Sequence, residues 1–344
     1  MSATTPARGE TLLEVRDLRV HFPTVDGLVR AVDGISFEIR RGEVLGVVGE
    51  SGSGKSVSFL TIMGLITSRQ AQITGEVIFK GRDLLKLPVD EMRHIRGKEM
   101  SMVFQDPMTS LHPMYRVGAQ VAEAVLAHEK VTKKAAAARA VEMLRKVGIA
   151  KPEEGARRYP HQFSGGMRQR AMIAMALVLD PDLLIADEPT TALDVTVQAQ
   201  ILDLIDRLKT EFHAAVAIIT HDLGVVAEHC DTIQVMYAGK IAEAGRGREM
   251  FYNSRHPYTW GLLQSIPRLD AEGAHRLNPI KGLPPSLIFV PPGCAFHPRC
   301  PYVMDVCRTV VPTLQTAPGA HPSACHLSDA EKVRIFEEKV LQRS

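Results

Sequence analysis

The sequence predicts an α/β protein in which parallel strands carry functional groups at their carboxyl ends, followed by a loop-rich C-terminal extension. Short apolar runs at 44–48, 183–186 and 216–220 each lead into glycine, charged or polar residues. Buried parallel strands have this pattern, with functional residues beyond their carboxyl ends. Twelve of the 21 prolines fall in the last 100 residues. Because proline fixes φ and removes a backbone donor, that part should consist largely of loops.

Size and composition set the broad limits. At ~100–200 residues per domain, the 344 residues predict two units, 1–245 and 246–344, with a boundary near Gly245. Hydrophobic residues make up 45% and the net charge is +2, which excludes wholesale disorder and a strong field for nucleic acid. The longest apolar run, Ala171–Leu179, is much shorter than the ~18–20 residues of a membrane span. The first ten residues lack the apolar core of a secretory signal, so we expect a cytosolic chain.

The elements before the boundary follow from local patterns. Leu12–Phe22 and Ile35–Ile39 alternate in the manner of half-buried strands. Val44–Val48 is a short apolar strand that leads into glycines, and Val57–Leu65 beyond them is expected to be a helix. Lys133–Val147 is rich in alanine with charges interspersed, which indicates another helix.

A glycine-rich loop connects the strand at 44–48 to the helix at 57–65. It matches GxxxxGK[ST] at every fixed position, and with Val57 its predicted nucleotide-binding residues are Gly49, Glu50, Ser51, Gly52, Ser53, Gly54, Lys55 and Ser56. The glycines let backbone N–H groups surround phosphate oxygens, and the helix N-terminus adds partial positive charge. Lys55 should reach the β- and γ-phosphates, and the Ser56 hydroxyl should bind Mg²⁺. A chance glycine-rich turn is the alternative, and the strand–loop–helix context argues against it.

Two carboxylates follow the apolar run at 183–186. Asp187 should hold Mg²⁺ through water, and Glu188 should act as general base on the attacking water. Many strands end in acidic residues, so this signal is weak alone. Paired with a phosphate loop about 130 residues upstream, it predicts a nucleotide hydrolase.

The segment at 163–170, FSGGMRQR, identifies the kind of hydrolase by resemblance. It resembles the signature of ABC ATPases, usually LSGGQ, and its matching residues here are Ser164, Gly165, Gly166 and Met167. In that family the loop faces the γ-phosphate held by the opposite subunit. The helical pattern at 167–179 follows directly, so Ser164 also suits a simple helix N-cap.

Other elements resemble the ABC family in the order in which the family has them. Gln105 resembles the Q-loop glutamine, whose amide contacts Mg²⁺, and Asp194 lies in a D-loop-like segment, TALD. His221, directly after the run at 216–220, resembles the switch histidine that contacts the γ-phosphate. Phe22 occupies the place of the aromatic residue that stacks on adenine. A lone histidine or aromatic residue at a strand end is more often structural.

The resemblance spans residues ~12–245. It implies a P-loop ABC ATPase with a RecA-like core, an antiparallel β subdomain and a helical subdomain at about 107–175, using ATP and Mg²⁺. There is one phosphate loop, no basic stripe and no coiled-coil insertion. The chain thus resembles a separate ATPase subunit of a prokaryotic importer, peripheral at the cytoplasmic face of the inner membrane. The alternative from another class is a soluble ABC ATPase that acts on nucleic acid or ribosomes.

The extension narrows the resemblance. The segment at 255–267, RHPYTWGLLQSIP, resembles an element of oligopeptide and dipeptide importer ATPases, and 74–77 and 104–113 fit the same subfamily. The resemblance implies as partners a second ATPase, most often a paralogue, two membrane permeases and an extracytoplasmic peptide-binding protein. Nucleic acid is not an expected partner. Nickel or another small solute remains open as the cargo, because no residue of this motif explains a substrate.

Four of the five cysteines lie between residues 294 and 325. Cys294, Cys300, Cys307 and Cys325 stand on proline-rich segments with little apolar sequence to bury, which favours a metal staple. The spacing resembles the C-terminal cluster of dipeptide importer ATPases, which implies a [4Fe–4S] cluster with four cysteine ligands. Zinc, with nearby histidines such as His297, His321 and His326, and free or disulfide-bonded thiols are the alternatives. Cys230 stands alone and is expected to be a buried apolar residue.

Overall fold

The computed structural model describes residues 9–191, 193–265, 280–315 and 321–340. The chain forms two compact units, each assembled from separate stretches of sequence. Unit 1 holds the described residues of Met1–Leu12, Ile39–Glu43 and Asp83–Ile219, and unit 2 those of Leu13–Glu38, Val44–Arg82 and Thr220–Ser344. The C-terminal extension thus belongs to the same compact unit as the glycine-rich loop.

Unit 2 begins with long antiparallel strands. The sheet order is β2-β1-β4-β5, with the bounds β1 Thr11–Thr24, β2 Gly27–Arg40, β4 Gln72–Phe79 and β5 Arg82–Asp83. Along β1 the buried side chains include Leu13, Val15, Leu18 and Val20, and β1 pairs with β4 in the register Leu13↔Phe79. The strand predicted at 12–22 is confirmed. The one predicted at 35–39 was too short, because its first half carries glycine, arginine and aspartate and shows little alternation.

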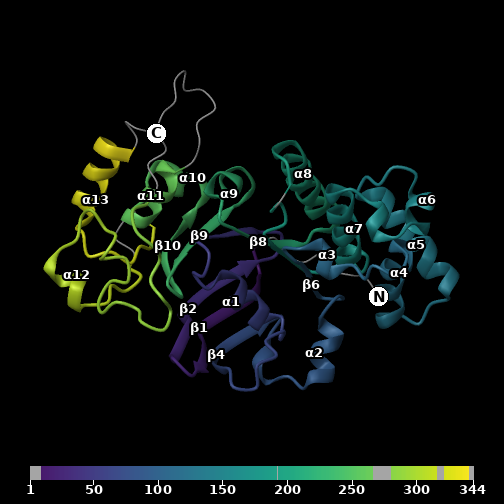
Figure 1. Ribbon diagram of the computed structural model, residues 1–344, viewed down its shortest axis with the longest axis horizontal. Coiled ribbons are helices and arrows are strands. Elements are labelled where there is room, and N and C mark those ends of the chain that lie inside the picture. The colour runs from purple at the N-terminus through teal and green to yellow at the C-terminus, as the bar shows by residue number, and fades with distance from the viewer. Residues whose placement is uncertain (1–8, 192, 266–279, 316–320, 341–344) are drawn as a thin grey trace. The chain divides into compact units, whose positions relative to one another are not determined.

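A second group of strands in unit 2 supports the glycine-rich loop. Strand β3 (Val44–Val48) is fully buried and parallel to β9 (Thr232–Tyr237), which pairs antiparallel with β10 (Lys240–Arg246). Helix α1 (Lys55–Ile62) follows the loop after β3. Helices α9 (Leu223–His229) and α10 (Gly247–Tyr252) pack together and against these strands (Figure 1).

Unit 1 contains the other buried parallel strands. Strands β6 (Met100–Val103), β7 (Leu183–Asp187) and β8 (Ala215–Thr220) pair in parallel in the order β6-β7-β8. The parallel pairing confirms the parallel strands predicted at 183–186 and 216–220. Every described residue of β7 and β8 is also buried, as predicted.

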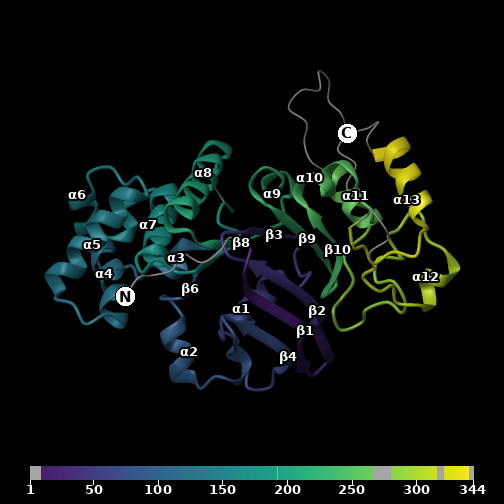
Figure 2. The same ribbon diagram turned by 180° about the vertical axis from the view of Figure 1, so that it is seen from behind.

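One group of packed helices in unit 1 is seen from behind in Figure 2. Helices α4 (Val117–His128), α5 (Lys133–Lys146), α6 (Pro152–Arg157) and α7 (Gly165–Leu177) pack on one another. The helix expected at 133–147 is therefore confirmed to within a residue. The remaining helical segments of the unit are η1 Leu84–Lys86, α2 Val89–Ile95, α3 Pro107–Ser110, η2 Pro160–Gln162 and α8 Val195–Phe212.

The extension contains short helices joined by loops. They are α10, already described, α11 (Pro257–Gln264), α12 (Asp305–Thr309), α13 (Asp329–Ile335) and the short π-helix η3 (Phe336–Val340). Trp260, Leu327, Ile335, Phe336 and Val340 form a small apolar core of its own. No helix or strand occurs in the described stretch 280–304, as the prolines predicted.

Backbone and buried polar contacts tie the extension to β10. Ala244 donates its N–H to the Pro322 carbonyl, and Ala324 donates to the Ala242 carbonyl. The fully buried Glu243 carboxylate accepts a hydrogen bond from the Ser254 hydroxyl at 3.0 Å and lies 2.6 Å from Nε2 of His321. Within the ranges described, no helix is long and apolar enough to cross a membrane.

Candidate active site

The glycine-rich loop has the backbone geometry that the motif requires. Gly54 caps α1 with φ +102°, a conformation that side chains disfavour, and a Cβ there would lie 2.3 Å from the Ala31 carbonyl oxygen. A Cβ on Gly49 would lie 2.3 Å from the Met236 carbonyl oxygen. Both ends of the loop therefore tolerate only glycine, which holds the loop close to β2 and β9.

Lys55 lies within its own loop. Its side chain is buried, and its ammonium donates to the carbonyl oxygens of Gly49 at 2.6 Å and Glu50 at 3.0 Å. The Lys55 ammonium thus binds carbonyl oxygens of its own loop, whereas the motif predicts phosphate oxygens as its partners. The other predicted residues of the loop, Ser51, Gly52, Ser53, Ser56 and Val57, occupy the turn and the first residues of α1, so the structure brings the whole motif together.

The predicted catalytic carboxylates lie in unit 1 at the end of β7. Asp187 is its last residue and is 7% exposed. Glu188 follows with φ +46°, a left-handed conformation that is unusual for a residue with a side chain. Its N–H donates to the Ile219 carbonyl at 2.8 Å, so β8 helps to hold this turn.

The Glu188 carboxylate is positioned by two neutral donors. Gln105 donates from Nε2 and Thr191 from Oγ1 to the same carboxylate oxygen, Oε2, each at 2.8 Å. Gln105 and Glu188 were predicted separately, and the structure brings them into direct contact. Thr191 belongs to the D-loop-like segment, but no feature of that segment predicted this contact.

The signature-like residues begin helix α7 of unit 1. The Ser164 hydroxyl accepts the N–H of Met167 at 3.3 Å, which is the N-cap geometry named as the simple alternative. A Cβ on Gly166 would lie 2.8 Å from Cγ1 of Val197, while a Cβ on Gly165 would have an ordinary contact with Leu193. The capping role of Ser164 is observed, and the role of Ser164, Gly165, Gly166 and Met167 toward a nucleotide stays a prediction.

The remaining predicted residues lie at element ends. Asp194 caps α8 by accepting the N–H of Val197 at 3.0 Å, and Ala192 of the same segment lies outside the described residues. In unit 2, His221 is exposed between β8 and α9, and Phe22 is half-buried in β1. The nucleotide-binding roles of His221 and Phe22 stay predictions.

The four clustered cysteines converge on one small cavity of the extension. Cys294, Cys300, Cys307 and Cys325 all line it, together with His297 and His326, and all four are free thiols. The N–H of Cys294 donates to the Cys307 carbonyl at 2.8 Å, which closes the loop that carries Cys300. Within the described ranges, no three His, Cys, Asp or Glu side chains are arranged to hold a single metal ion. Cys230 lies apart and is buried near Gly46, as predicted.

Burial keeps most of these thiols protonated in the absence of a cation. It raises the pKa of Cys300 to about 12 and that of Cys325 to about 11, and it also raises the pKa of Cys294. Burial lowers the pKa of the neighbouring His256 to about 4, so that its ring is neutral at physiological pH. A bound cation would therefore favour deprotonation of Cys294, Cys300 and Cys325.

The extension also contacts the glycine-rich loop, which the sequence did not predict. Tyr258 accepts the N–H of Glu50, and Arg299 makes two hydrogen bonds to the Glu50 carboxylate. Tyr258 belongs to the segment at 255–267, called here the HPYT element, so the signal for this residue was present. The last two residues of that segment, Ile266 and Pro267, lie outside the described residues.

Two family models match the chain. One, described as ABC transporter, matches residues 32–191, and the other, described as oligopeptide/dipeptide transporter, C-terminal region, matches residues 242–307. The dipeptide transport ATP-binding protein DppD of Bacillus subtilis is 53% identical over 93% of this chain and 96% of its own length. The oligopeptide transport ATP-binding protein OppD of Salmonella typhimurium is 52% identical over 91% of this chain and 93% of its own.

Solved structures match the ATPase part. The dimeric, post-hydrolysis structure of the ATP-binding cassette MJ0796 with ADP and Pi has a TM-score of 0.62 and 26% identity, covering 69% of this chain and 99% of that one. The structure of cbiO1 from Clostridium perfringens has a TM-score of 0.60 and 28% identity, covering 71% and 92%. These likenesses confirm the predicted fold class.

Proposed function

Because this chain belongs to the ABC transporter family, among the ATP-binding subunits of oligopeptide and dipeptide transporters, we propose that it hydrolyses ATP to drive uptake of peptides through separate membrane subunits. The observation that carries the proposal is that 53% identity to a dipeptide transport subunit extends over 93% of the chain. The similarity therefore includes both the ATPase part and the C-terminal extension. The intact glycine-rich loop and the positioned Glu188 support an active enzyme over an inactive relative.

The residues of each unit have distinct tasks in this reaction. Lys55 and the N–H groups of the loop bind the phosphates of ATP, and Phe22 stacks on the adenine. Glu188 accepts a proton from the attacking water while Gln105 and Thr191 hold its carboxylate, and His221 contacts the γ-phosphate. Such catalysis consists mainly of positioning and electrostatic stabilisation.

Magnesium supplies charge neutralisation for the phosphates when it is bound. The predicted donors are the Ser56 hydroxyl, the Gln105 amide and the Asp187 carboxylate, all oxygen groups of the kind that Mg²⁺ prefers. Asp187 is buried as the last residue of β7, the strand end at which the sequence predicted a magnesium ligand. The donor set therefore fits the ion.

The proposal includes a second ATPase subunit. Ser164, Gly165, Gly166 and Met167 bind the γ-phosphate of ATP held by that partner, and Asp194 lies in the loop that crosses the same interface. We propose that the partner is a paralogue, and that residues 1–245 form the ATPase domain with a helical subdomain at about 107–175. Two permeases and an extracytoplasmic peptide-binding protein complete the transporter. The chain would then sit at the cytoplasmic face of the inner membrane.

Co-expression of the chain with candidate permeases and a candidate binding protein from the same genome tests this function. We expect the chain to co-purify with two membrane proteins and a second ATPase, and peptide-loaded binding protein to stimulate ATP hydrolysis in vesicles. Stimulation by nickel but not by peptide would identify nickel as the cargo and would still support an importer. Co-purification with ribosomes or nucleic acid, without permeases, would contradict the importer itself.

The cysteine cavity brings together four cysteine side chains, the ligand set of a [4Fe–4S] cluster. Among the described residues no three His, Cys, Asp or Glu side chains are arranged to hold a single metal ion such as zinc. In a [4Fe–4S] cluster each cysteine binds a different iron, so the cysteine sulfurs lie farther apart than the ligands of a single ion. Burial raises the pKa values of the Cys300 and Cys325 thiols, and the positive charge of iron ions would favour their deprotonation. We propose that Cys294, Cys300, Cys307 and Cys325 hold a [4Fe–4S] cluster with a structural role.

Anaerobic purification with iron and acid-labile sulfide assays checks the cluster. The wild-type chain should be coloured and contain about four irons, and Cys300→Ser should lose most of that iron. Cys230→Ser is the matched control, because Cys230 is buried away from the cavity, and it should keep its iron. A colourless wild-type sample that contains zinc would refute the iron–sulfur assignment.

A further inference from the structure

The HPYT element forms the start of a helix that directs one side chain at the glycine-rich loop. The neutral His256 ring accepts the N–H of Tyr258 through Nδ1 at 3.1 Å and caps α11, while Pro257 takes the first helical position. Tyr258 is fully buried, and its hydroxyl oxygen accepts the N–H of Glu50 at 2.8 Å. The motif thus fixes the backbone of the loop's second residue.

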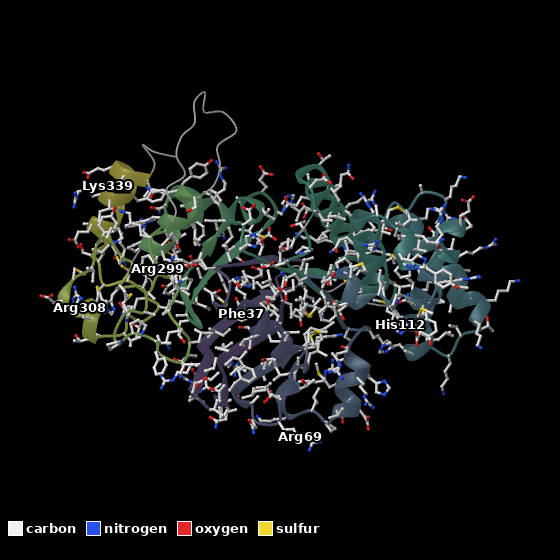
Figure 3. All side chains as sticks on the ribbon, in the orientation of Figure 1. Phe37, Arg69, His112, Arg299, Arg308 and Lys339 are labelled. Atoms are coloured by element: carbon white, nitrogen blue, oxygen red, sulfur yellow. The ribbon has the colours of Figure 1, made fainter. Side chains whose placement is uncertain are left out.

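Arg299 holds the side chain of the same residue. Its guanidinium donates from Nη1 to Oε2 of Glu50 at 2.6 Å and from Nη2 to Oε1 at 2.9 Å, a two-pronged pair that only arginine makes. The side chain of Arg299, labelled in Figure 3, is only 5% exposed, compared with 26% for Glu50. Because this ion pair is shielded from water, removing one partner should cost more free energy than removing a partner from an exposed surface pair.

The surroundings leave Arg299 little freedom. Its Nε donates to the Lys281 carbonyl at 3.1 Å and its Nη1 also to the Tyr237 hydroxyl at 3.3 Å. The guanidinium carbon lies 5.9 Å from the ring centre of Tyr237 and 6.0 Å from that of Phe296, within the range of cation–π attraction. Arg299 is therefore positioned before any ligand arrives.

The contacts of Glu50 lead directly to the phosphate-binding lysine. Its N–H and its carboxylate are held by the extension, and its carbonyl accepts a hydrogen bond from the Lys55 ammonium at 3.0 Å. An unpaired carboxylate at this position would also repel the anionic phosphates of a nucleotide. Arg299, which lies 249 positions away from Glu50 in the sequence, supplies the compensating positive charge.

We propose that Arg299 is a positioning residue for nucleotide binding: from the C-terminal extension it fixes Glu50 of the glycine-rich loop and neutralises its charge. This rests on the proposed function, since it takes the loop to bind ATP. It gives the extension a task within the ATPase cycle in addition to holding a cluster. Arg299 directly precedes Cys300, so the loop that carries the cysteines also carries this contact.

Nucleotide affinities of the full-length chain test the inference. ATP dissociation constants, measured by calorimetry with Mg²⁺, should rise roughly tenfold in Arg299→Ala, as for loss of a hydrogen-bonded charge partner. Arg299→Lys should be intermediate, because an ammonium neutralises Glu50 without the two-pronged geometry. Arg308→Ala is the matched control: Arg308 is exposed at the periphery of the extension in Figure 3 and should bind ATP normally.

A second substitution distinguishes charge and positioning from loss of packing. Adding Glu50→Gln to Arg299→Ala removes the uncompensated carboxylate and should restore affinity to within about threefold of the wild type. The inference is overturned if Arg299→Ala binds ATP as tightly as the wild type, or if the double variant binds no better than Arg299→Ala. If the wild-type chain itself binds no ATP, the proposed function fails, which is a separate result.

Discussion

Replacing Glu188 by glutamine should leave ATP binding intact and lower the rate of ATP hydrolysis by roughly a thousandfold. Glutamine keeps the size of the side chain and cannot accept the proton of the attacking water. The left-handed backbone at Glu188 and its bond to the Ile219 carbonyl do not depend on the carboxylate, so the fold should persist. Phosphate release assays give the rate, and calorimetry gives the affinity for ATP.

The same variant should accumulate in an ATP-bound state. In the two-subunit ATPase proposed above, hydrolysis ends the closed state. Size-exclusion chromatography of Glu188→Gln with the proposed partner and ATP should therefore retain a stable dimer. Glu123→Gln is the matched control, since Glu123 is an exposed carboxylate on α4 of the same unit. Normal turnover in Glu188→Gln would show that another group activates the water.

Three of the buried parallel strands were predictable because their signal is local, whereas β6 and β9 were not predicted. Strands β3, β7 and β8 are short runs of apolar residues that end at functional groups, and such runs are buried whatever surrounds them. Strand β2 was predicted at less than half its length. The first half of β2 shows no regular alternation of buried and exposed side chains, so the local pattern does not mark it as a strand, although β2 pairs with β1 in the sheet.

The long-range contacts of the site were beyond the sequence. Gln105 and Glu188 were chosen for their resemblance to separate motifs, and their hydrogen bond joins residues 83 positions apart. Arg299 carried no signal at all, because an isolated arginine beside a cysteine is not distinctive. Its pairing with Glu50 arises only because unit 2 combines an early and a late stretch of the chain.

The HPYT element shows the limit of resemblance more directly. By resemblance it indicated a peptide importer, yet it offered no physical reason for its residues. The structure supplies one: histidine caps a helix, proline begins it and tyrosine reaches Glu50. These are tasks of folding and of loop placement, so the motif need not contact any cargo.

Replacing Lys55 by alanine should weaken ATP binding on the order of a hundredfold, and hydrolysis should fall with it. Lys55 is 5% exposed and its ammonium is hydrogen-bonded to two carbonyl oxygens of its own loop, so it is positioned for phosphate before ATP binds. Its removal costs the charge-assisted bonds to the phosphates and leaves those carbonyls without this donor. Calorimetry with ATP measures the loss, and Lys134→Ala, at an exposed position of α5, should change nothing.

Comparison of the two catalytic variants separates binding from chemistry. Glu188→Gln should bind ATP without hydrolysing it, whereas Lys55→Ala should fail at the earlier step, so adding Glu188→Gln to it should not restore a stable ATP-bound dimer. Thermal unfolding of Lys55→Ala without nucleotide should lie within a few degrees of the wild type, while the stabilisation that ATP gives the wild type should be absent. ATP binding at wild-type affinity in Lys55→Ala would mean that the N–H groups of the loop alone hold the phosphates, and that the lysine acts only on the transition state.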